Sequence, residues 1–331
     1  MRPSRGYRPQ CPLPLVIMAG RDAKGQPLPE GCDSHWLAGY KAVEWAVDGH
    51  PLIATLVHRA RASGHFDPIY VAGPADRLRP LALDAVLIDT DGELDVNIAA
   101  ALAALGDQIK GSVAFLASDI LPSVASLNAA MALYAASRRS AIFFPLVRVP
   151  EQQESLGQSG YKPRYRLVEP GGQESAVLPG HLLIVRPTAI RLNLVYALVR
   201  LGYRTRNQPV RQRTWRMLLG AIGFLLREDL RLLLAGKAPH LTLTVVRNAL
   251  IVSRSLQQGQ IGTHALMRRL RAVLVRASYR LRHPRTAVVL PVTDLLDLAK
   301  DFDTVEEIEA AGGTRAGAPS GTPAGDDQPR L

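Results

Sequence analysis

The sequence predicts an α/β protein with a mostly parallel sheet and a separate, basic helical region. Short apolar runs rich in β-branched residues alternate with helical patterns of ten or more residues in the first half of the chain, which is typical of parallel βαβ units. The 331 residues are 47% hydrophobic and 21% charged, an ordinary globular composition. A chain of this length can bury a sizeable core without disulfides, metals or repeats.

In the first half, the expected strands and helices follow one another in regular order. Strands are expected at 15–19, 69–72, 85–88, 113–117 and 141–147. Helices are expected at 51–64, 97–105 and 123–136. The first of these helices has clear boundaries, because Pro51 stands at its start and Gly64 at its end.

The second half of the chain changes character at residue 150. Residues 150–175 are polar and rich in Gln, Gly, Pro and Ser, which predicts a mobile loop over one face of the sheet. The elements expected after it are a strand at 182–185, helices at 214–235 and 263–281 with a strand at 241–246 between them, a strand at 287–290, and an acidic helix at 305–311. Residues 312–331 have the composition of a disordered tail.

These patterns divide the chain into five regions. They are an N-terminal extension at 1–12, a core at 13–190, a basic and mostly helical insertion at 191–286, a return to the core at 287–311, and the tail.

The positive charge is concentrated in one region. The chain carries a net charge of +11, and residues 191–290 alone carry +17, with Glu228 and Asp229 as their only acidic residues. Such a region usually faces an anion, which can be a phosphorylated substrate, a nucleic acid or an acidic membrane surface. Nucleic acid is the weakest of these options, because no known binding motif accompanies the arginines and aromatic residues make up only 5% of the chain.

Residues 214–235 combine leucines, arginines and Trp215 in an amphipathic pattern. Three interpretations fit this pattern: a helix packed on the core with a solvated basic face, a helix at the interface of an anionic membrane, or a lid over an acceptor site. Amphipathicity alone does not separate them.

Cysteine usage and hydropathy favour a cytoplasmic protein. Cys11 and Cys32 lie too far apart for a Cys-x-x-Cys pair, and no second pair completes a zinc site. The apolar run at 13–19 is short and contains a proline, so a secretion signal is not expected. The longest apolar run, at 217–226, is about half of a bilayer-spanning length.

Polar residues after two expected strands are candidates for phosphate or metal chemistry, since ligands of open α/β sheets bind at the carboxyl ends of strands. Gly20 and Arg21 follow the first strand, where a glycine either forms a plain turn or lets backbone N–H groups approach a phosphate. Asp119 follows the fourth strand, where a carboxylate either caps the next helix or holds Mg²⁺.

Two more stretches carry charged candidates. Lys41 follows the loop and could neutralise charge during phosphoryl transfer, although an isolated lysine is usually solvated surface. Asp301 and Asp303 precede the short acidic helix, for which Thr304 and Glu307 fit a capping box. The two aspartates remain available for a metal.

Taken in order, these residues resemble the MobA-like members of the nucleotidyltransferase family, which are related to molybdenum-cofactor guanylyltransferase. The resemblance covers 13–190 and 287–311, and it depends on the joint order of its motifs. They are Met18-Ala19-Gly20, Tyr40-Lys41-Ala42, Gly49-His50-Pro51-Leu52-Ile53, Phe66-Asp67-Pro68-Ile69-Tyr70-Val71, Ser118-Asp119 to Pro122, and Asp301-Phe302-Asp303-Thr304. The resemblance implies a three-layer α/β/α, Rossmann-like core of the GT-A type.

The resemblance also implies a reaction, the transfer of a nucleoside monophosphate from an NTP to a phosphorylated small-molecule acceptor with release of pyrophosphate. The loop at Ala19-Gly20-Arg21 would cradle the triphosphate and Lys41 would stabilise its charge. Asp119 and Asp303, with Asp301 as a further candidate, would hold Mg²⁺. Asn97 matches an asparagine that in relatives opens a helix near the nucleotide, and a plain N-cap is the alternative.

The sequence departs from the family pattern in two places. Arg21 stands where a second loop glycine is expected, and an insertion at 22–39 separates the loop from the lysine. Gly180-His181 replaces the Gly-Gly-Asn that many relatives place near the acceptor, so both residues are candidates for acceptor binding, and a hydrogen-bonded structural role is the alternative for His181. A second hypothesis follows: a catalytically degenerate relative that keeps the fold as a binding or membrane-peripheral protein.

Overall fold

The computed structural model describes residues 12–21, 37, 39–106, 109, 111–137, 140–150, 164–204 and 210–316. Most of the N-terminal extension, both cysteines, nearly all of the insertion at 22–39 and residues 317–331 of the expected tail lie outside the described residues.

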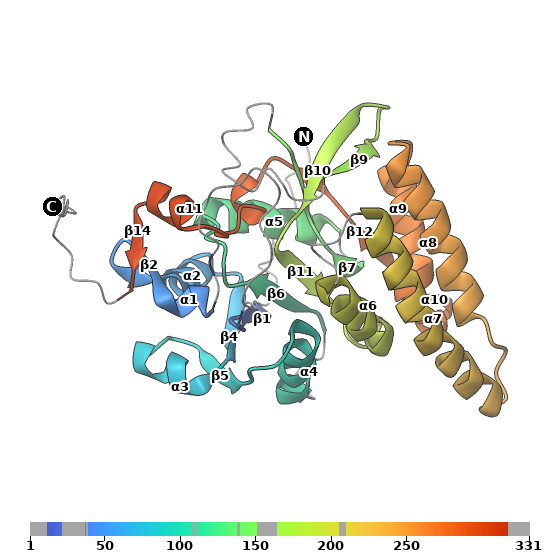
Figure 1. Cartoon of the computed structure of the whole chain (residues 1–331), viewed down its shortest axis with the longest axis horizontal. Helices are drawn as coiled ribbons and strands as arrows, with labels where there is room; N and C mark the ends of the chain where they lie inside the picture. The colour runs from blue at the N-terminus through green and yellow to red at the C-terminus, as the bar shows by residue number, and fades with distance from the viewer. Residues whose placement is uncertain are drawn as a thin grey trace, which may run out of the picture.

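A seven-stranded central sheet forms the core of the molecule (Figure 1). Its strands lie in the order β12-β7-β11-β6-β1-β4-β5, and every pairing is parallel except the two that β11 makes. This arrangement confirms the predicted α/β class. The strands are β1 (Leu13–Met18), β4 (Phe66–Gly73), β5 (Val86–Asp89), β6 (Val113–Ala117), β7 (Ser140–Phe143), β11 (Leu182–Val185) and β12 (Ala287–Val289).

Helices cover both faces of this sheet. Side chains alternate between the two faces of a strand, so Leu15 and Ile17 of β1 join one core cluster while Val16 joins the other. The first cluster packs against α2 (Leu52–Ala62) and α5 (Val124–Ala136). The second packs against α4 (Leu94–Leu105) and α9 (Thr263–Leu274).

A four-stranded sheet corrects two expectations from the sequence. Its order is β13-β8-β10-β9, formed by β8 (Leu146–Arg148), β9 (Tyr165–Val168), β10 (Glu174–Pro179) and β13 (Val292–Thr293). Two of these strands fall in or across the end of the expected loop at 150–175, of which residues 151–163 lie outside the described residues. The single strand expected at 141–147 is divided between β7 and β8 at Pro145, which has no N–H to donate to a ladder.

A small sheet of order β14-β2-β3 joins the C-terminal end of the described chain to residues 45–51. It contains β2 (Trp45–Val47), β3 (His50–Pro51) and β14 (Gly313–Arg315). The beginning of the expected disordered tail is therefore ordered at residues 313–315. A Cβ atom added to Gly313 would lie 2.3 Å from Ile308 Cγ2, so only glycine permits the close packing that holds this strand.

The basic region forms a helical layer at one side of the molecule (Figure 1), which we define as α7 (Val210–Leu234), α8 (Leu241–Gln257), α9 and α10 (Ala277–Arg282). α6 (Leu192–Arg204) connects it to the core. A small apolar cluster that includes Leu194, Ala221, Leu225 and Leu241 holds α6, α7 and α8 together. The remaining elements are α1 (Lys41–Glu44), α3 (Ala75–Leu78), η1 (Arg79–Leu81), η4 (Leu296–Leu298) and α11 (Val305–Ala310).

Two predictions for the basic region are wrong. The strand expected at 241–246 is the start of α8, because the Asp229 carboxylate accepts hydrogen bonds from the backbone N–H groups of His240, Leu241 and Thr242 at 3.0, 2.8 and 2.8 Å. The helix expected at 263–281 is divided into α9 and α10, since Val275 leaves the helix to pair with Ile190.

Candidate active site

Three aspartates from distant parts of the chain form an acidic cluster, defined here as Asp119, Asp301 and Asp303. One carboxylate oxygen from each lies within 4.8 Å of the others. Asp119 lies in the turn after β6, and the segment after η4 carries the other two. Backbone pairing joins the two segments, since Ile120 pairs with Asp301 and the Phe302 N–H donates to the Asp119 carbonyl oxygen at 2.8 Å.

Lys41 points into this cluster. Its Nζ lies 2.9 Å from Asp303 Oδ1, and the two residues are 3% and 8% exposed. Lys41 is the first residue of α1, a short helix that the sequence did not predict. A cation buried among carboxylates offsets part of their mutual repulsion.

A capping box fixes the segment that carries Asp303. The Thr304 side chain accepts a hydrogen bond from the Glu307 N–H, and Glu307 Oε2 accepts from the Asp303 N–H at 2.8 Å. This confirms the capping box predicted from the sequence, and it leaves the Asp303 side chain directed to Lys41.

The turn after β1 lies beside the acidic cluster. Met18 of β1 and Ala117 of β6 are paired in register, and Gly20 and Asp119 each follow two residues later. Both residues therefore lie at the carboxyl ends of adjacent parallel strands, where the sequence analysis places the site. The Arg21 side chain is exposed.

Asn97 lies under this turn. A Cβ atom added to Gly20 would be 2.6 Å from Asn97 Nδ2, so this position requires glycine. Asn97 is buried, accepts hydrogen bonds from Thr90 Oγ1 and the Gly92 N–H, and donates to the Gly92 carbonyl oxygen. It lies in the first turn of α4, whose N-cap residue is Glu93, so the alternative of a plain N-cap is wrong.

His181 approaches the acidic cluster from β11. Its Nε2 lies 3.7 Å from Asp301 Oδ2, an ion pair when the imidazole is protonated. Its backbone is fixed on both sides, because the His181 N–H donates to the Leu298 carbonyl oxygen and its own carbonyl accepts from the Ala117 N–H. Gly180 contacts Pro145 instead, and a Cβ atom added to it would lie 2.8 Å from the Pro145 carbonyl oxygen.

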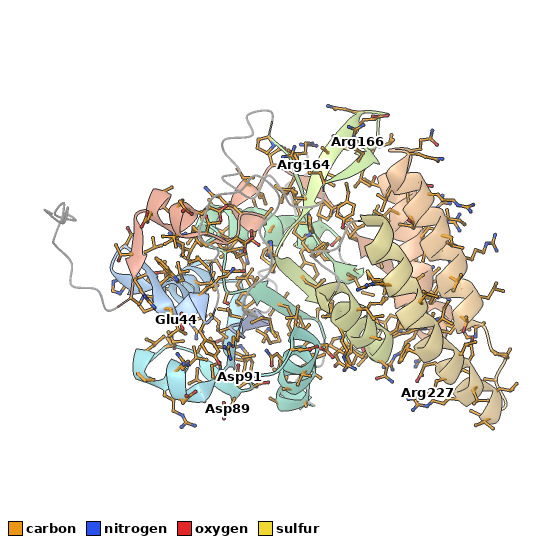
Figure 2. The ribbon with its side chains drawn as sticks, viewed as in Figure 1. Glu44, Asp89, Asp91, Arg164, Arg166 and Arg227 are labelled. Atoms are coloured by element: carbon orange, nitrogen blue, oxygen red, sulfur yellow. The ribbon has the colours of Figure 1, made fainter. Side chains whose placement is uncertain are left out.

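A second group of polar side chains, Tyr40, Arg77 and Asp91, lies at the same sheet edge and was not predicted from the sequence. The Tyr40 hydroxyl donates to Asp91 Oδ2 at 2.8 Å, and the Arg77 guanidinium lies 4.5 Å from the centre of the Tyr40 ring. The hydrogen bond to Asp91, together with burial, raises the pKa of the Tyr40 hydroxyl. Figure 2 shows Glu44, Asp89 and Asp91 on the part of the molecule formed by α1, α3 and β5. Asp89 and Asp91 stand at the end of β5, so the rule that located Asp119 would also have found them.

Comparison with solved structures shows the fold. The chain is similar to a structure described as a hypothetical transferase from Thermus thermophilus, with a TM-score of 0.53 and 18% identity over 89% of this chain and 99% of that one. A CMP:2-keto-3-deoxy-manno-octonic acid synthetase complexed with CTP aligns at a TM-score of 0.39 and 10% identity, covering 68% of this chain and 86% of that one. A 4-diphosphocytidyl-2C-methyl-D-erythritol synthase from Anaerococcus prevotii aligns at 0.34 and 10% identity, covering 57% and 75%.

No family model matches the sequence, and no curated protein matches it. The first of the three structures establishes the Rossmann-like arrangement of the core.

Proposed function

We propose that this protein is a Mg²⁺-dependent nucleotidyltransferase of the MobA-like kind. It would move a nucleoside monophosphate from an NTP to a phosphorylated small-molecule acceptor and release pyrophosphate. One observation carries the proposal: the acidic cluster and Lys41 meet at the carboxyl edge of the sheet, beside the glycine turn after β1. The Thermus thermophilus protein that shares this fold is itself described as a hypothetical transferase.

The acidic cluster fits a hard divalent cation. Its three side chains offer only oxygen ligands, which Mg²⁺ prefers, and they come close enough to share one ion. Asp119 and Asp303 would hold Mg²⁺, with Asp301 as a third ligand. Bound there, the ion would supply positive charge to the triphosphate of the nucleotide.

Lys41 would add a fixed positive charge to the same site. Because Asp303 holds its ammonium group, the lysine is oriented before the nucleotide arrives. It would stabilise the negative charge that moves toward the leaving pyrophosphate.

The reaction requires alignment more than a general base. An oxygen of the acceptor phosphate would attack the α-phosphorus of the NTP, and the bond between that phosphorus and the oxygen bridging to the β-phosphate would break. The acceptor phosphate already carries a nucleophilic oxygen at neutral pH, so no proton must be removed first.

Residues around the glycine turn would bind the triphosphate. Ala19 and Gly20 allow close approach of the backbone, and Asn97 supports the turn from below. Arg21 is exposed and would contribute charge from the side. Its presence in place of a second glycine favours the alternative that the turn no longer binds nucleotide.

His181 is the candidate for acceptor binding. Its Nε2 lies 3.7 Å from Asp301 Oδ2, where β6 ends and β11 begins. A protonated imidazole there would attract the acceptor phosphate. Gly180 would act only by permitting the close contact with Pro145 that places His181.

We further propose that α7 makes peripheral contact with an anionic membrane on the cytoplasmic side. Its buried face packs on α6 and α8, whereas its other face exposes a row of leucines spaced at helical intervals. The row is flanked by exposed Arg216, Arg227 and Arg231, which suits an interface of apolar chains and anionic headgroups. The row of exposed leucines consists of Leu219, Leu226, Leu230 and Leu233. No helix among the described residues is long and apolar enough to cross a bilayer.

The direct test is pyrophosphate release. The purified chain, Asp119→Ala and a matched control, Asp84→Asn, are each incubated with every NTP, Mg²⁺ and a panel of phosphorylated acceptors. Asp84→Asn removes an exposed carboxylate that is not part of the acidic cluster. We expect release with one nucleotide and acceptor, retained in the control and lost in Asp119→Ala. Equal release from the native chain and Asp119→Ala would contradict the proposal, and no release from either would favour the degenerate relative.

A further inference from the structure

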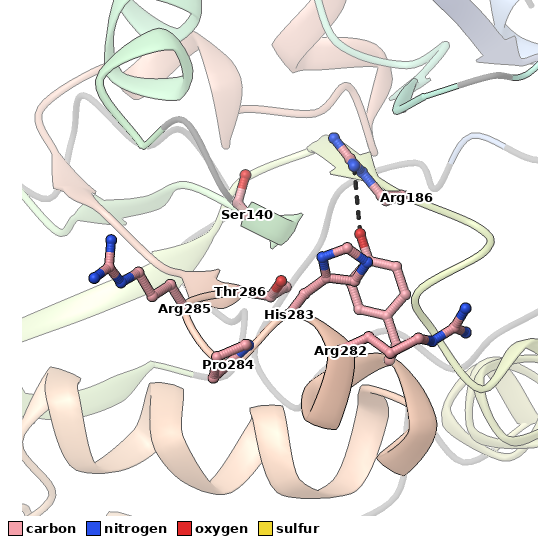
Figure 3. Close-up of a pocket in the computed structure, with 8 residues that line it drawn as sticks. Ser140, Arg186, Arg282, His283, Pro284, Arg285 and Thr286 are labelled. Carbon is pink, nitrogen blue, oxygen red and sulfur yellow. Dashed lines mark hydrogen bonds between the residues drawn. The ribbon is translucent and has the colours of Figure 1, made fainter.

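A polar cavity lies at the edge of the central sheet opposite to the candidate active site. It has a volume of about 510 Å³ and is lined by Ser140, Arg186, Tyr279, Arg282, His283, Pro284, Arg285 and Thr286 (Figure 3). Ser140 begins β7 and Thr286 directly precedes β12, so both lie at the amino ends of parallel strands. Arg186 directly follows the antiparallel β11 and therefore reaches the same edge.

Strand β11 separates this cavity from the candidate active site. His181 precedes the strand at the acidic cluster, and Arg186 follows it at the cavity. Five residues of extended chain, at about 3.4 Å each, place their backbones about 17 Å apart. The cavity is therefore a separate site, and its function does not depend on the reaction proposed above.

The lining of the cavity is cationic. Arg186, Arg282 and Arg285 supply the positive charge, and the His283 ring and the hydroxyl groups of Ser140, Thr286 and Tyr279 add hydrogen-bonding groups. No carboxylate is among the lining residues, and within the described part of the chain no ion pair engages these arginines. The site thus offers hydrogen-bond donors and positive charge without a neutralising group.

Arg186 has an unsatisfied donor. Its Nη1 donates to the Tyr279 hydroxyl at 3.3 Å (Figure 3), and its Nε is buried with no hydrogen-bond partner among the described residues. A buried donor without a partner costs free energy, so an acceptor atom bound beside it would be stabilising. Figure 3 also shows Arg282 and Arg285 on opposite sides of the His283 ring.

Further arginines lie close in sequence to the lining residues, at Arg191, Arg276 and Arg280. Arg191 has its pKa lowered to about 10 by burial and by the nearby charges of Arg280 and Arg276. Burial and the charge of Arg271 lower the pKa of Arg280 as well. Burial is the larger cause of both shifts, and repulsion between the positive charges adds to it.

We propose that this cavity binds a phosphate monoester. Guanidinium groups match the oxygens of phosphate in paired hydrogen bonds, and the cavity is large enough for a small phosphorylated molecule. The phosphate belongs either to a soluble compound or to a lipid whose headgroup is itself a phosphate monoester, such as phosphatidic acid, since the same chemistry recognises both.

The test measures binding of two probes to the full chain without Mg²⁺. Inorganic phosphate is titrated in a calorimeter, and vesicles of phosphatidylcholine with and without phosphatidic acid are tested by sedimentation. Arg186→Gln removes the guanidinium whose Nε is buried, and Arg285→Gln removes the guanidinium of an exposed lining residue. Arg166→Gln is the matched control, since it removes an exposed arginine of β9 outside the cavity (Figure 2).

If the ligand is a soluble compound, we expect the native chain and the control to bind phosphate. Both cavity variants should bind it about tenfold or more weakly. If the ligand is a lipid, we expect no binding of free phosphate. The native chain and the control should then sediment with phosphatidic acid vesicles, and both cavity variants should not. The proposal is overturned if the native chain binds neither probe, or if Arg166→Gln weakens binding as much as the cavity variants do.

Discussion

Lys41 Nζ and Asp303 Oδ1 lie 2.9 Å apart although 262 positions separate the two residues in the chain. The contact joins the helix after the first loop to the segment before α11, and both partners are buried. It therefore serves two purposes: it closes the fold over the carboxyl edge of the sheet, and it places one cation among three carboxylates.

Removing the cation of this pair destabilises the fold. We expect Lys41→Met to lower the free energy of unfolding by about 3–5 kcal/mol, because it leaves the buried carboxylates to repel one another. Urea denaturation checks this value. Mg²⁺ should recover more stability in the variant than in the native chain, since the ion would replace part of the missing charge.

The same experiment has a matched control. Arg61→Met removes a cation paired with Asp67, whose side chain is 64% exposed, and such surface pairs contribute about 1 kcal/mol or less. A Lys41→Met variant as stable as Arg61→Met, or one that Mg²⁺ does not affect, would contradict the account of the cluster.

The turn after β1 is predicted to reject any side chain. In Gly20→Ala, the new Cβ atom would approach within 2.6 Å of Asn97 Nδ2, so either Asn97 loses its hydrogen bonds to Gly92 or the turn shifts. We expect a loss of stability of about 1–3 kcal/mol and a larger loss of nucleotide affinity. Both are measured by thermal unfolding with and without nucleotide.

Gly111→Ala is the control for this substitution. A Cβ atom added to Gly111 meets nothing within 4 Å. It should leave stability and nucleotide affinity unchanged, and if Gly20→Ala does the same, the turn does not depend on close contact with Asn97.

How far the sequence alone predicts this molecule depends on the range of the interactions. The strands and helices of the core follow from local periodicity, and the residues after β1 and β6 are located by strand direction alone. The helix start at Leu241 was missed because its alternating leucines and threonines imitate a strand, and only the distant Asp229 carboxylate reveals the cap. The hydrogen bond between Tyr40 and Asp91 was missed because it joins residues that are 51 positions apart.

The pH dependence of stability should show the contribution of Glu169. Hydrogen bonds from Arg148 and Ser175 hold the pKa of this carboxyl at about 2, below its ordinary value of 4.5. The native state thus prefers the ionised form, so the stabilisation is complete above pH 4.5 and is lost as the pH falls toward 2.

The comparison that isolates this group is the native chain against Glu169→Gln. We expect the difference in free energy of unfolding to be constant from neutral pH down to about 5 and to shrink at lower pH. A difference that does not change with pH would mean that the ionised carboxylate contributes nothing through Arg148.

Membrane contact through α7 is tested by its exposed leucines. Leu226 and Leu230 are 56% and 54% exposed, so replacing both with glutamine should reduce binding to anionic vesicles about tenfold or more without destabilising the fold. Sedimentation with vesicles of phosphatidylcholine and phosphatidylserine measures this.

Leu133→Gln is the control on another surface, since Leu133 is an exposed leucine of α5. If Leu133→Gln weakens vesicle binding as much as the α7 substitutions do, α7 is not the contact surface. The same conclusion follows if all of these variants bind vesicles as the native chain does.

The central claim is that the acidic cluster and Lys41 bind a nucleoside triphosphate with Mg²⁺. Its most direct test is a thermal unfolding titration of the native chain, Asp119→Ala, Lys41→Ala and Asp84→Asn with ATP, GTP, CTP and UTP, each with and without Mg²⁺. A ligand at 100 times its Kd adds about 2.7 kcal/mol to stability. We predict a Mg²⁺-dependent stabilisation by one nucleotide, kept in Asp84→Asn and lost in the other two variants, whereas no stabilisation by any nucleotide, or an equal one in Asp119→Ala, would contradict the claim.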